Sequence, residues 1–412
     1  MKQQFDTSLF IKLAASLEGE FFFDDTMRTL YATDASVYKE YPLAVCYPNT
    51  KKDIQSLIQF AHQHKTSLIP RTAGTSLGGQ VVGGGIVVDV SKYFDKILEV
   101  NKDEKYCIVQ PGVVRDELNR QLKSTGLFFA PETSTANRAM IGGMVGNNSC
   151  GTNSIVYGST RDHVLELTGF LSDGSEVIFK NLSPDIFQEK TKLQSLEGSI
   201  YNFLSEELSN KETQQEILQQ FPNQKIHRRN TGYAIDELLK QQPFNQNGKP
   251  FNLCELICGS EGTLAFITEI KLNLVPLPPK EKVVVAIHFK TLEESLCATV
   301  IAMKHQPTAC ELIDKIILDC TKQNIEQSKN RFFVKGDPEA ILCVEFHGET
   351  KEEIDVKAKA LQQDFENENV GYHFPYLYGN DINKIWTLRK AGLGLLANIP
   401  GDAKAVAVIE DT

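Results

Sequence analysis

The chain has 412 residues, of which 41% are hydrophobic and 23% are charged, and its formal net charge is −10. This length and composition predict a globular protein of two or three domains, and the negative charge disfavours a nucleic-acid partner bound through its phosphates. No apolar run approaches the roughly 20 residues that span a bilayer, and the N-terminus lacks a signal-peptide core, which together favour a cytoplasmic location.

The first predicted elements lead up to a glycine-rich loop. We expect a helical lead-in over residues 1–30 and an irregular stretch with short strand candidates over Leu30–Thr50. Apolar residues at helical spacing predict a helix over Asp53–Lys65. Two short apolar runs, Ser67–Pro70 and Ile86–Val90, predict buried strands on either side of the loop.

The loop itself is PRTAGTSLGGQVVGGGIVVD, Pro70–Asp89, with six glycines. Backbone N–H groups in such a loop can form a concavity for a diphosphate, because glycine has no Cβ to hold a ligand away. The Walker motif is absent, since Gln80 and Val81 follow Gly79, and no glycines have the spacing of the GxGxxG fingerprint. By itself, the stretch is equally compatible with a plain turn between two strands.

A second glycine-rich stretch follows in a region that alternates strands with short helices. Cys107–Gln110 is a strand candidate, and Pro111–Gly126 has the apolar spacing of an amphipathic helix that starts at its proline. PETST, Pro131–Thr135, then leads into AMIGGMVGNNSCGTNSIVYG, Ala139–Gly158, whose small and polar residues let a ligand lie against the backbone. Leu165–Phe179 predicts a hairpin with SDG as its turn.

The remainder divides into a polar region, a third glycine stretch and a second domain. Asn181–Pro250 is rich in Gln, Asn, Lys and Glu and has the character of an insertion, whereas CGSEGTLAFITEI, Cys258–Ile270, precedes a β-branched strand. The nine cysteines are scattered, which favours reduced thiols and no metal site. Pro276–Pro279 is the expected domain boundary, and the β-α-β-α alternation after it predicts a ferredoxin-like domain. Val406–Thr412 has the character of an unfinished strand, so we expect a fragment of a longer protein.

Three of these stretches, PRTAGTSLGGQ, MIGGMVGNNSCGTNSIVYGST and CGSEGTLAFITEI, resemble the flavin-binding elements of the vanillyl-alcohol-oxidase/p-cresol-methylhydroxylase (PCMH) superfamily. YATDASVYKEYP and WTLRKAGLGLL are similar to its branch of D-lactate, glycolate and D-2-hydroxyglutarate dehydrogenases. The resemblance implies an α+β fold, with a two-lobed PCMH-type FAD-binding domain at 1–280 and a partial, truncated ferredoxin-like α+β cap domain at 281–412. The lobes would cover about 1–100 and 101–277, with the insertion at about 181–250.

The same resemblance implies FAD as the cofactor. Some relatives attach FAD through a histidine of the glycine loop, but Thr75 and Ser76 stand there in this sequence, so noncovalent FAD is expected. Arg71–Gly79 would hold the diphosphate, and residues of PETST and of the second stretch would line the second lobe. Residues of the third stretch would pack near the adenine end or the ribityl chain. The implied FAD residues are Arg71, Thr72, Ala73, Gly74, Thr75, Ser76, Leu77, Gly78, Gly79, Pro131, Glu132, Thr133, Gly142, Gly143, Asn147, Ser149, Gly151, Tyr157, Gly262, Thr263 and Ile267.

The implied activity is that of an FAD-dependent oxidoreductase, which oxidises D-2-hydroxyglutarate or D-lactate to the 2-oxo acid by hydride transfer to flavin N5. Arg389, in WTLRK, would bind the substrate carboxylate through its planar guanidinium, unless it is a surface arginine paired with an acid. The catalytic histidines of the family are expected beyond Thr412. His288, His347 and His373 are expected to be structural, with His347 as the alternative base.

Other functions remain open at this point. The insertion is similar to that of relatives fused to an iron–sulfur half, so electrons would pass to a non-NAD acceptor: an iron–sulfur module, a quinone or another flavoprotein. A poorly active fragment, peripheral at the inner membrane through its acceptor, is one expectation. A noncatalytic flavoprotein subunit and an NADPH-dependent flavin reductase of the same superfamily are the alternatives.

Overall fold

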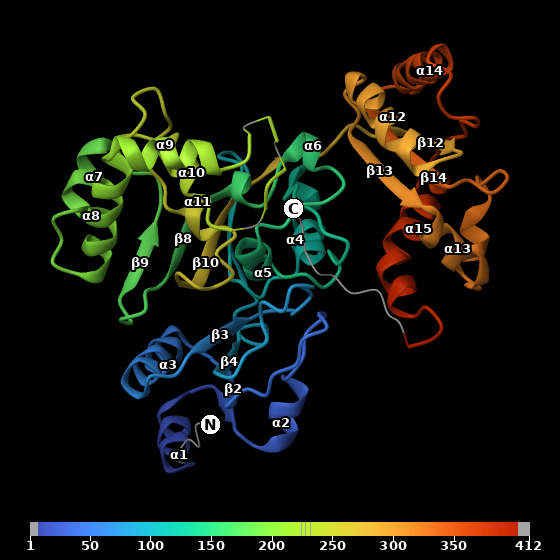
Figure 1. Cartoon of the computed structure of the whole chain (residues 1–412). Coiled ribbons are helices and arrows are strands. Elements are labelled where there is room, and N and C mark those ends of the chain that lie inside the picture. The colour runs from blue at the N-terminus through green and yellow to red at the C-terminus, as the bar shows by residue number, and fades with distance from the viewer. Residues whose placement is uncertain (1–6, 224, 227, 231, 403–412) are drawn as a thin grey trace. The chain divides into compact units, whose positions relative to one another are not determined.

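The computed structural model contains two compact units, and each has its own sheets and cores (Figure 1). The first unit runs to Gly151 and from Tyr157 to Pro276, and the second begins at Leu277 and includes Thr152–Val156. No helix within the described part of the chain is long and apolar enough to cross a membrane. The expected strand at Val406–Thr412 lies outside that part. The structure describes residues 7–223, 225–226, 228–230 and 232–402.

The first lobe of unit 1 is a four-stranded sheet of order β1-β2-β4-β3. Its strands β2 and β3 both run parallel to β4, and β1 is antiparallel to β2. Apolar residues of helices α1 and α3 share one core with alternate residues of the strands. The elements are α1 (Thr7–Ser16), β1 (Glu20–Phe22), α2 (Asp25–Leu30), β2 (Ala44–Tyr47), α3 (Lys51–His64), β3 (Leu68–Arg71) and β4 (Ile86–Asp89).

The predicted helical lead-in was wrong in its middle, where β1 interrupts the two helices. Phe21 of β1 pairs with Cys46 of β2, and its ring packs 5.5 Å from that of Phe10 on α1. Three residues are too few to show a strand period, so only the pairing with β2 identifies this strand. Helix α3 forms as predicted, because Thr50 and Asp53 form a capping box at its start.

The second lobe is a five-stranded antiparallel sheet of order β5-β6-β10-β8-β9. Along its central strand β10, buried residues alternate with half-buried ones, as expected of a sheet with one face in the core. The predicted hairpin is confirmed as β8 and β9, joined by a turn at Gly174. The five strands are β5 (Ile97–Asn101), β6 (Tyr106–Val109), β8 (Val164–Phe170), β9 (Glu176–Phe179) and β10 (Phe266–Asn273). Two short strands, β7 (Leu127–Phe128) and β11 (Val275–Pro276), pair with each other in a separate antiparallel sheet.

The helix predicted to start at Pro111 instead starts at Arg115, as α4. Residues Pro111 and Val113 do not enter the helix, because their carbonyl groups accept hydrogen bonds from Gly142 and Ile141 at the start of α5. The second-lobe helices are α4 (Arg115–Leu122), α5 (Ile141–Asn147), α7 (Pro184–Lys190), α8 (Leu196–Ser209), α9 (Lys211–Gln220), α10 (Ile235–Leu239) and α11 (Cys254–Ile257). The short helix α6 (Ser154–Tyr157) falls mostly in the segment Thr152–Val156, which belongs to unit 2.

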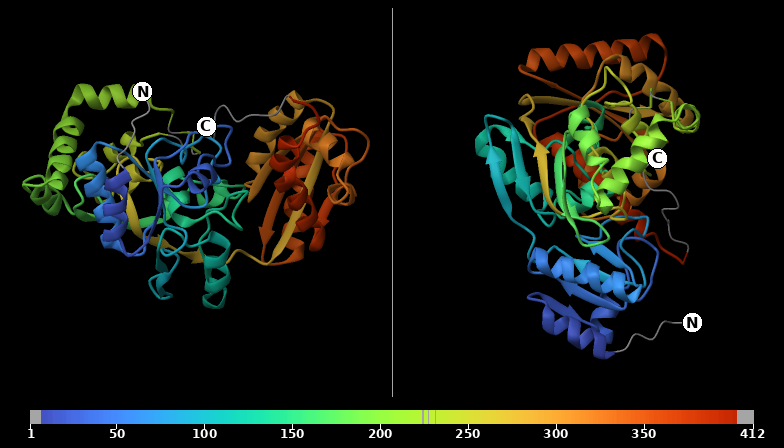
Figure 2. Two further views of the ribbon diagram at one scale, coloured as in Figure 1. Left: turned by 90° about the horizontal axis from the view of Figure 1, so that it is seen from below. Right: turned by 90° about the vertical axis from the view of Figure 1, so that its left-hand side faces the viewer.

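Unit 2 has the predicted ferredoxin-like arrangement, an antiparallel sheet of order β13-β14-β12-β15 between two helical layers (Figures 1 and 2). Helices α12 and α14 pack on one face, and α13 and α15 pack on the other. The elements are β12 (Glu281–Phe289), α12 (Leu292–Lys304), β13 (Ala309–Asp314), α13 (Lys315–Gln323), β14 (Ala340–Gly348), α14 (Lys351–Asn367), β15 (Tyr376–Tyr378) and α15 (Asn380–Ala397).

Candidate functional site

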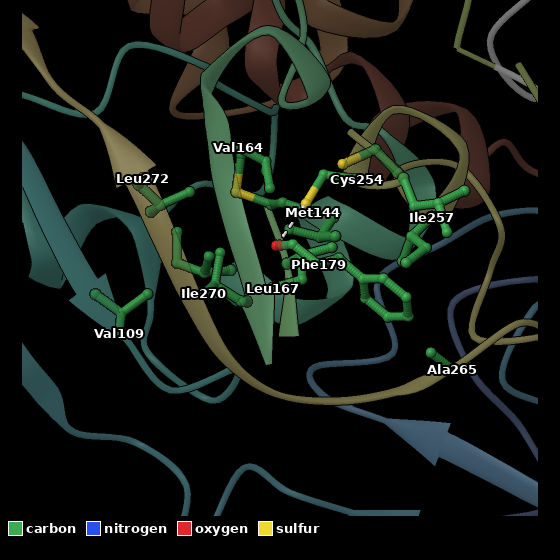
Figure 3. Close-up of a cluster of buried hydrophobic side chains, with 14 of the residues drawn as sticks. Val109, Met144, Val164, Leu167, Phe179, Cys254, Ile257, Ala265, Ile270 and Leu272 are labelled. Carbon is green, nitrogen blue, oxygen red and sulfur yellow. Dashed lines mark hydrogen bonds between the residues drawn. The ribbon is translucent and has the colours of Figure 1, made fainter. Parts of the chain in front are cut away.

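Helix α5 is the element on which the three glycine-rich stretches converge. Its apolar face lies in the core of the second lobe, where Met144 packs among side chains of the central strands (Figure 3). Its first turn is fixed by the carbonyl groups of Pro111 and Val113, and Asn148 ends it in the left-handed conformation with φ 47°. The opposite face is only half-buried and consists of Gly142, Gly143, Gly146 and Asn147.

The first glycine stretch forms the loop between β3 and β4. Gly74 and Gly79 have φ of +63° and +81°, a conformation that favours glycine. The YATDASVYKEYP segment runs alongside this loop, since Ala35 N–H donates to the carbonyl of Gly74 over 3.1 Å. Tyr38 covers Gly79, where an added Cβ would lie 2.6 Å from the tyrosine ring. Two segments that are about 40 residues apart in the sequence therefore lie side by side and line the same side of the loop.

The loop reaches the half-buried face of α5. A Cβ on Gly143 would lie 2.5 Å from Thr72 Oγ1, so the helix and the loop meet at that point. Gln80, which is hydrogen-bonded to Ser76, donates from Nε2 to Asn147 Oδ1 over 3.3 Å. The loop and the helix thus belong to one site, although they come from different lobes.

The PETST stretch lies beside the same loop. Thr135 donates to Thr75 over 3.4 Å and shares a hydrogen bond of 3.2 Å with Thr133. A Cβ on Gly151 would lie 2.5 Å from the Glu132 carbonyl oxygen. The second stretch therefore folds back on PETST next to the loop.

The third glycine stretch closes on the C-terminal end of α5. Gly259 N–H donates to the Val145 carbonyl over 3.0 Å, and Glu261 N–H donates to the Gly146 carbonyl over 2.9 Å. A Cβ on Gly262 would approach Pro70 of β3 to 3.3 Å. The first and third stretches thus both contact α5, the short helix that the second stretch forms.

Other predicted site residues lie at the margins of this arrangement. Ser149 accepts from Asn147 Nδ2 over 3.2 Å, and the Thr263 hydroxyl bonds to Tyr233 over 2.6 Å. Burial raises the pKa of Tyr157, whose ring packs edge-on against Phe128. The remaining residues have these places: Ala73, Leu77 and Gly78 lie in the loop, Pro131 is buried, and Ile267 lies on β10 opposite Gly169.

The site fits an elongated ligand that carries a diphosphate. The half-buried face of α5 has three glycines among its four residues, so backbone can approach a ligand there without intervening side chains. The loop opposite presents more glycines with positive φ, whose backbone N–H groups suit phosphate oxygens. A Cβ at Gly142 or Gly143 would obstruct this arrangement.

Sequence reasoning missed Gln80 and Thr135 as members of the site. Both stand inside stretches that had been singled out, GGQ and PETST, but neither was assigned a role. Their importance comes from contacts across the two lobes, Gln80 to Asn147 and Thr135 to Thr75. The sequence did offer one clue: each residue has a hydrogen-bonding side chain and stands beside a segment expected to bind the ligand, Gln80 after Gly79 and Thr135 after Thr133.

In unit 2, Arg389 lies on α15 and is held by the sheet beneath it. Its Nε and Nη2 atoms contact Glu311 Oε2 of β13 at 2.9 and 2.6 Å. The arginine side chain is 36% exposed, compared with 13% for the glutamate. The ion pair occupies one edge of the guanidinium, and Nη1 has no hydrogen-bond partner among residues that the structure describes.

A buried polar cluster lies on the same face of that sheet. Glu345 accepts from Trp386 Nε1 over 2.8 Å and pairs with His347 Nε2 over 2.7 Å. Burial alone would raise the pKa of Glu345, but the hydrogen bond and charge of His347, the charge of Lys282 and the hydrogen bond of Trp386 hold that pKa below its usual value. Trp386 and Arg389 thus fasten α15 to two carboxylates.

The three histidines considered as candidate bases, all in unit 2, serve its own structure. His288 is buried, with Nδ1 bonded to the Ala286 carbonyl at 2.8 Å, and burial lowers its pKa to about 4. His373 pairs with His288 through the backbone, and burial also lowers its pKa. His347 is paired with Glu345, and the ring of His373 packs 5.0 Å from that of His288, so each ring has a structural partner.

Two protein families match the chain in succession. The family described as "FAD binding domain" matches residues 42–180, and the family described as "FAD linked oxidases, C-terminal domain" matches residues 278–412. The chain belongs to the FAD-linked oxidases. The family resemblance predicted from the three stretches is therefore confirmed, and FAD is the cofactor of this family.

Curated relatives of this FAD-linked oxidase include D-2-hydroxyglutarate dehydrogenases. The protein of that name from Pseudomonas putida is 34% identical over 410 residues, covering 97% of this chain and 40% of the relative. The Escherichia coli protein of that name is 32% identical, and the match covers 98% of this chain and 40% of the relative. Glycolate oxidase subunit GlcD of Bacillus subtilis is 27% identical, covering 71% and 50%. The chain spans about 40% of the length of the first two relatives.

Solved structures agree with the predicted fold class. Alkyldihydroxyacetonephosphate synthase aligns with a TM-score of 0.65 at 16% identity, over 96% of this chain and 64% of that one. Substrate-bound p-cresol methylhydroxylase aligns with a TM-score of 0.63 at 12% identity, and the alignment covers 94% of this chain and 71% of that one. The FAD-linked oxidase chain therefore has the two-lobed PCMH-type fold followed by a ferredoxin-like cap, as predicted.

Proposed function

We propose that the chain is the flavin part of a dehydrogenase that oxidises D-2-hydroxyglutarate, with D-lactate as the second choice, to the 2-oxo acid. The observation that carries the proposal is the convergence of three glycine-rich stretches on α5, in a chain 34% identical to a D-2-hydroxyglutarate dehydrogenase over 97% of its length. The proposed division is a FAD-binding domain at 1–280 and a cap domain at 281–412.

In this proposal, FAD lies along the half-buried face of α5. The glycine loop from Arg71 to Gly79 holds the diphosphate with backbone N–H groups, and Gly142, Gly143 and Asn147 line the opposite side. Bound FAD would supply the two-electron acceptor for the oxidation. Thr75 and Ser76 stand where some relatives have a histidine, so we propose that the cofactor is held noncovalently.

The substrate carboxylate is assigned to Arg389. Glu311 occupies the Nε and Nη2 edge, and that pairing orients the planar guanidinium. A guanidinium held in this way can bind a carboxylate with little loss of side-chain freedom. The proton acceptor is assigned to none of His288, His347 or His373, since each has a structural partner.

The acceptor of the electrons belongs to the proposal as well. An iron–sulfur module, a quinone or another flavoprotein would each accept electrons without NAD. We place the protein in the cytoplasm, with contact to the inner membrane only through such an acceptor. The absence of a spanning helix among the described residues is compatible with this location.

The test is an anaerobic titration of the FAD-loaded chain, followed by its visible absorbance. D-2-hydroxyglutarate or D-lactate should bleach the flavin, and L-2-hydroxyglutarate, the matched control, should not. Bleaching by NADPH alone would contradict the proposal and favour a flavin reductase. A bound flavin that none of these compounds bleaches would contradict catalysis by this chain and favour a noncatalytic flavoprotein subunit.

A further inference from the structure

Two opposite charges stand in register at the entrance to the glycine loop but do not pair with each other. Arg71 ends β3, and Asp89 is its partner on the parallel strand β4. Within the described residues, no carboxylate forms an ion pair with Arg71. Asp89 is 5% exposed, and its oxygens accept from Tyr31 O–H over 2.7 Å and from Ser91 N–H over 2.8 Å. The acid is therefore engaged elsewhere.

The direction of these hydrogen bonds follows from the donors available. An ionised carboxylate only accepts, so the single hydroxyl proton of Tyr31 points to Asp89. The second bond of Tyr31, 2.6 Å to the hydroxyl of Tyr47, must then be donated by Tyr47. Burial, and then the bonds to Tyr47 and Asp89, raise the pKa of Tyr31, so its hydroxyl remains a donor at physiological pH.

The ring of Tyr31 forms one side of a slot that holds Arg71. The guanidinium carbon lies 4.9 Å from the ring centroid, and Nη1 donates to the Thr33 carbonyl over 3.0 Å. A Cβ on Gly74 would lie 2.8 Å from Nη2, and Gly74 has a φ of +63°, so glycine at this position lets the loop backbone lie against the cation. The guanidinium is thus fixed between an aromatic face and the backbone of the loop.

This arrangement keeps a positive charge beside the glycine loop without neutralising it. A direct pair with Asp89 would cancel that charge and draw the side chain back toward the strand ends. We propose that Tyr31 is a positioning residue: tied to Asp89 by its hydroxyl, it holds Arg71 at the loop as a fixed positive charge for the FAD diphosphate. The inference rests on the FAD site proposed above.

The first test measures the dissociation constant of FAD for the full chain, from the quenching of flavin fluorescence. Arg71→Gln should weaken FAD binding at least about tenfold, because it removes a charge-assisted contact to phosphate. Tyr31→Phe keeps the ring but loses the tie to Asp89, and should weaken binding by about tenfold. Tyr93→Phe is the matched control: it loses a hydroxyl that donates to Glu20 in the same lobe, and should leave FAD binding unchanged.

The second test separates positioning from a merely structural role. In Tyr31→Phe, the released carboxylate of Asp89 can pair with Arg71, its partner in register. Replacing that carboxylate in the double variant Tyr31→Phe/Asp89→Asn should restore most of the lost FAD affinity. If Tyr31 only stabilised the lobe, the second substitution would lower the melting temperature further and restore no affinity.

The outcomes separate this inference from the proposed function. If the parent chain binds FAD but Arg71→Gln or Tyr31→Phe binds it equally well, the inference is overturned and the FAD site stands. Failure of the rescue also overturns it, since the explanation requires Asp89 to compete for Arg71. If the parent chain does not bind FAD, the proposed FAD site fails and the inference fails with it.

Discussion

Gly143 of α5 and Thr72 of the glycine loop approach so closely that a Cβ on the glycine would lie 2.5 Å from the threonine Oγ1. A Cβ added to either of two other glycines of the same helix would meet different surroundings. A Cβ on Gly142 would lie 2.4 Å from the rigid ring of Pro111, whereas a Cβ on Gly146 would have only ordinary contacts, the nearest at 3.8 Å. The three glycines of this helix therefore differ in how much room they leave for a side chain.

Alanine at these three positions should have ordered effects. Gly142→Ala should destabilise the first unit by about 2 kcal/mol, within the range for overpacking. Gly143→Ala should cost less, because the Thr72 hydroxyl can rotate away, and should chiefly weaken FAD binding. Gly146→Ala should be neutral or stabilising by about 1 kcal/mol, since alanine favours helix. Urea denaturation and FAD titration of the three variants check the order, and equal effects at positions 142 and 146 would contradict it.

Asp53 stabilises the first lobe through hydrogen bonds of a single side chain. Its buried carboxylate accepts from the backbone N–H groups of Glu18 and Asn49, both over 2.8 Å, and of Thr50 over 3.1 Å. Asp53→Ala should lower the free energy of unfolding by about 3 kcal/mol, because it removes a helix cap and leaves buried donors unpaired. Far-ultraviolet circular dichroism in urea measures this change.

The control for this prediction is Asp53→Asn, which keeps one accepting oxygen. It should lose about half as much stability as the alanine variant. A loss below about 0.5 kcal/mol in Asp53→Ala, typical of a surface substitution, would contradict the assigned role.

Because His288 is buried, we expect the stability of the second unit to depend on pH. Its pKa is lowered to about 4 by burial, while an unfolded histidine has a pKa of about 6.5. The unfolded state therefore takes up a proton first, and stability should fall as the pH drops from about 6.5 to about 4, by about 3 kcal/mol in all. Trp386, the only tryptophan of the chain, reports on this unit by fluorescence.

His288→Gln should flatten this dependence, because glutamine does not titrate. The exposed residue His62 gives the control, His62→Gln, which should leave the pH profile of the Trp386 transition unchanged. A profile that is equally steep in His288→Gln and in the parent chain would assign the dependence to other groups.

We expect Arg389 to bind the carboxylate of the substrate in the second unit. Arg389→Gln should weaken the binding of D-2-hydroxyglutarate to the FAD-loaded chain at least about tenfold, since it removes a charged hydrogen bond. Glu311→Gln should have a smaller effect, because it loosens the orientation of the guanidinium and keeps its charge. The shift of the flavin spectrum on titration with the acid measures binding.

Lys384→Gln is the matched control for Arg389→Gln. It removes one positive charge from the same helix, where Lys384 pairs with Asp381 one turn away and lies over the ring of Phe332. Unchanged affinity in Arg389→Gln, or an equal loss in both variants, would argue against the assigned carboxylate site.

The sequence predicted those parts of the structure that depend on local pattern. The glycine stretches, helix α3 with Thr50 and Asp53 at its start, and the hairpin at Gly174 all follow from residue types at short spacing. The family resemblance then predicted that the stretches would share one site. Pro111 was misjudged because a proline at a helix start and a proline in an extended segment have the same local appearance.

The contacts between distant segments were beyond local pattern. Gln80 reaches Asn147 from another lobe, and Glu311 reaches Arg389 from a strand 78 residues away. Strand register places Asp89 opposite Arg71, and register is a property of the folded sheet. The hydrogen bond from Tyr31 to Asp89 likewise joins segments 58 residues apart. Such partners become visible only when the strands are paired.

The most direct measurement is the visible absorption spectrum of the full chain after incubation with FAD and gel filtration. We expect one flavin per chain, which denaturation releases completely, because the glycine loop holds the cofactor without a covalent bond. Gly142→Ala, in the same experiment, should retain less flavin. A parent chain that emerges folded but colourless would contradict the claim that the three stretches around α5 form a FAD site.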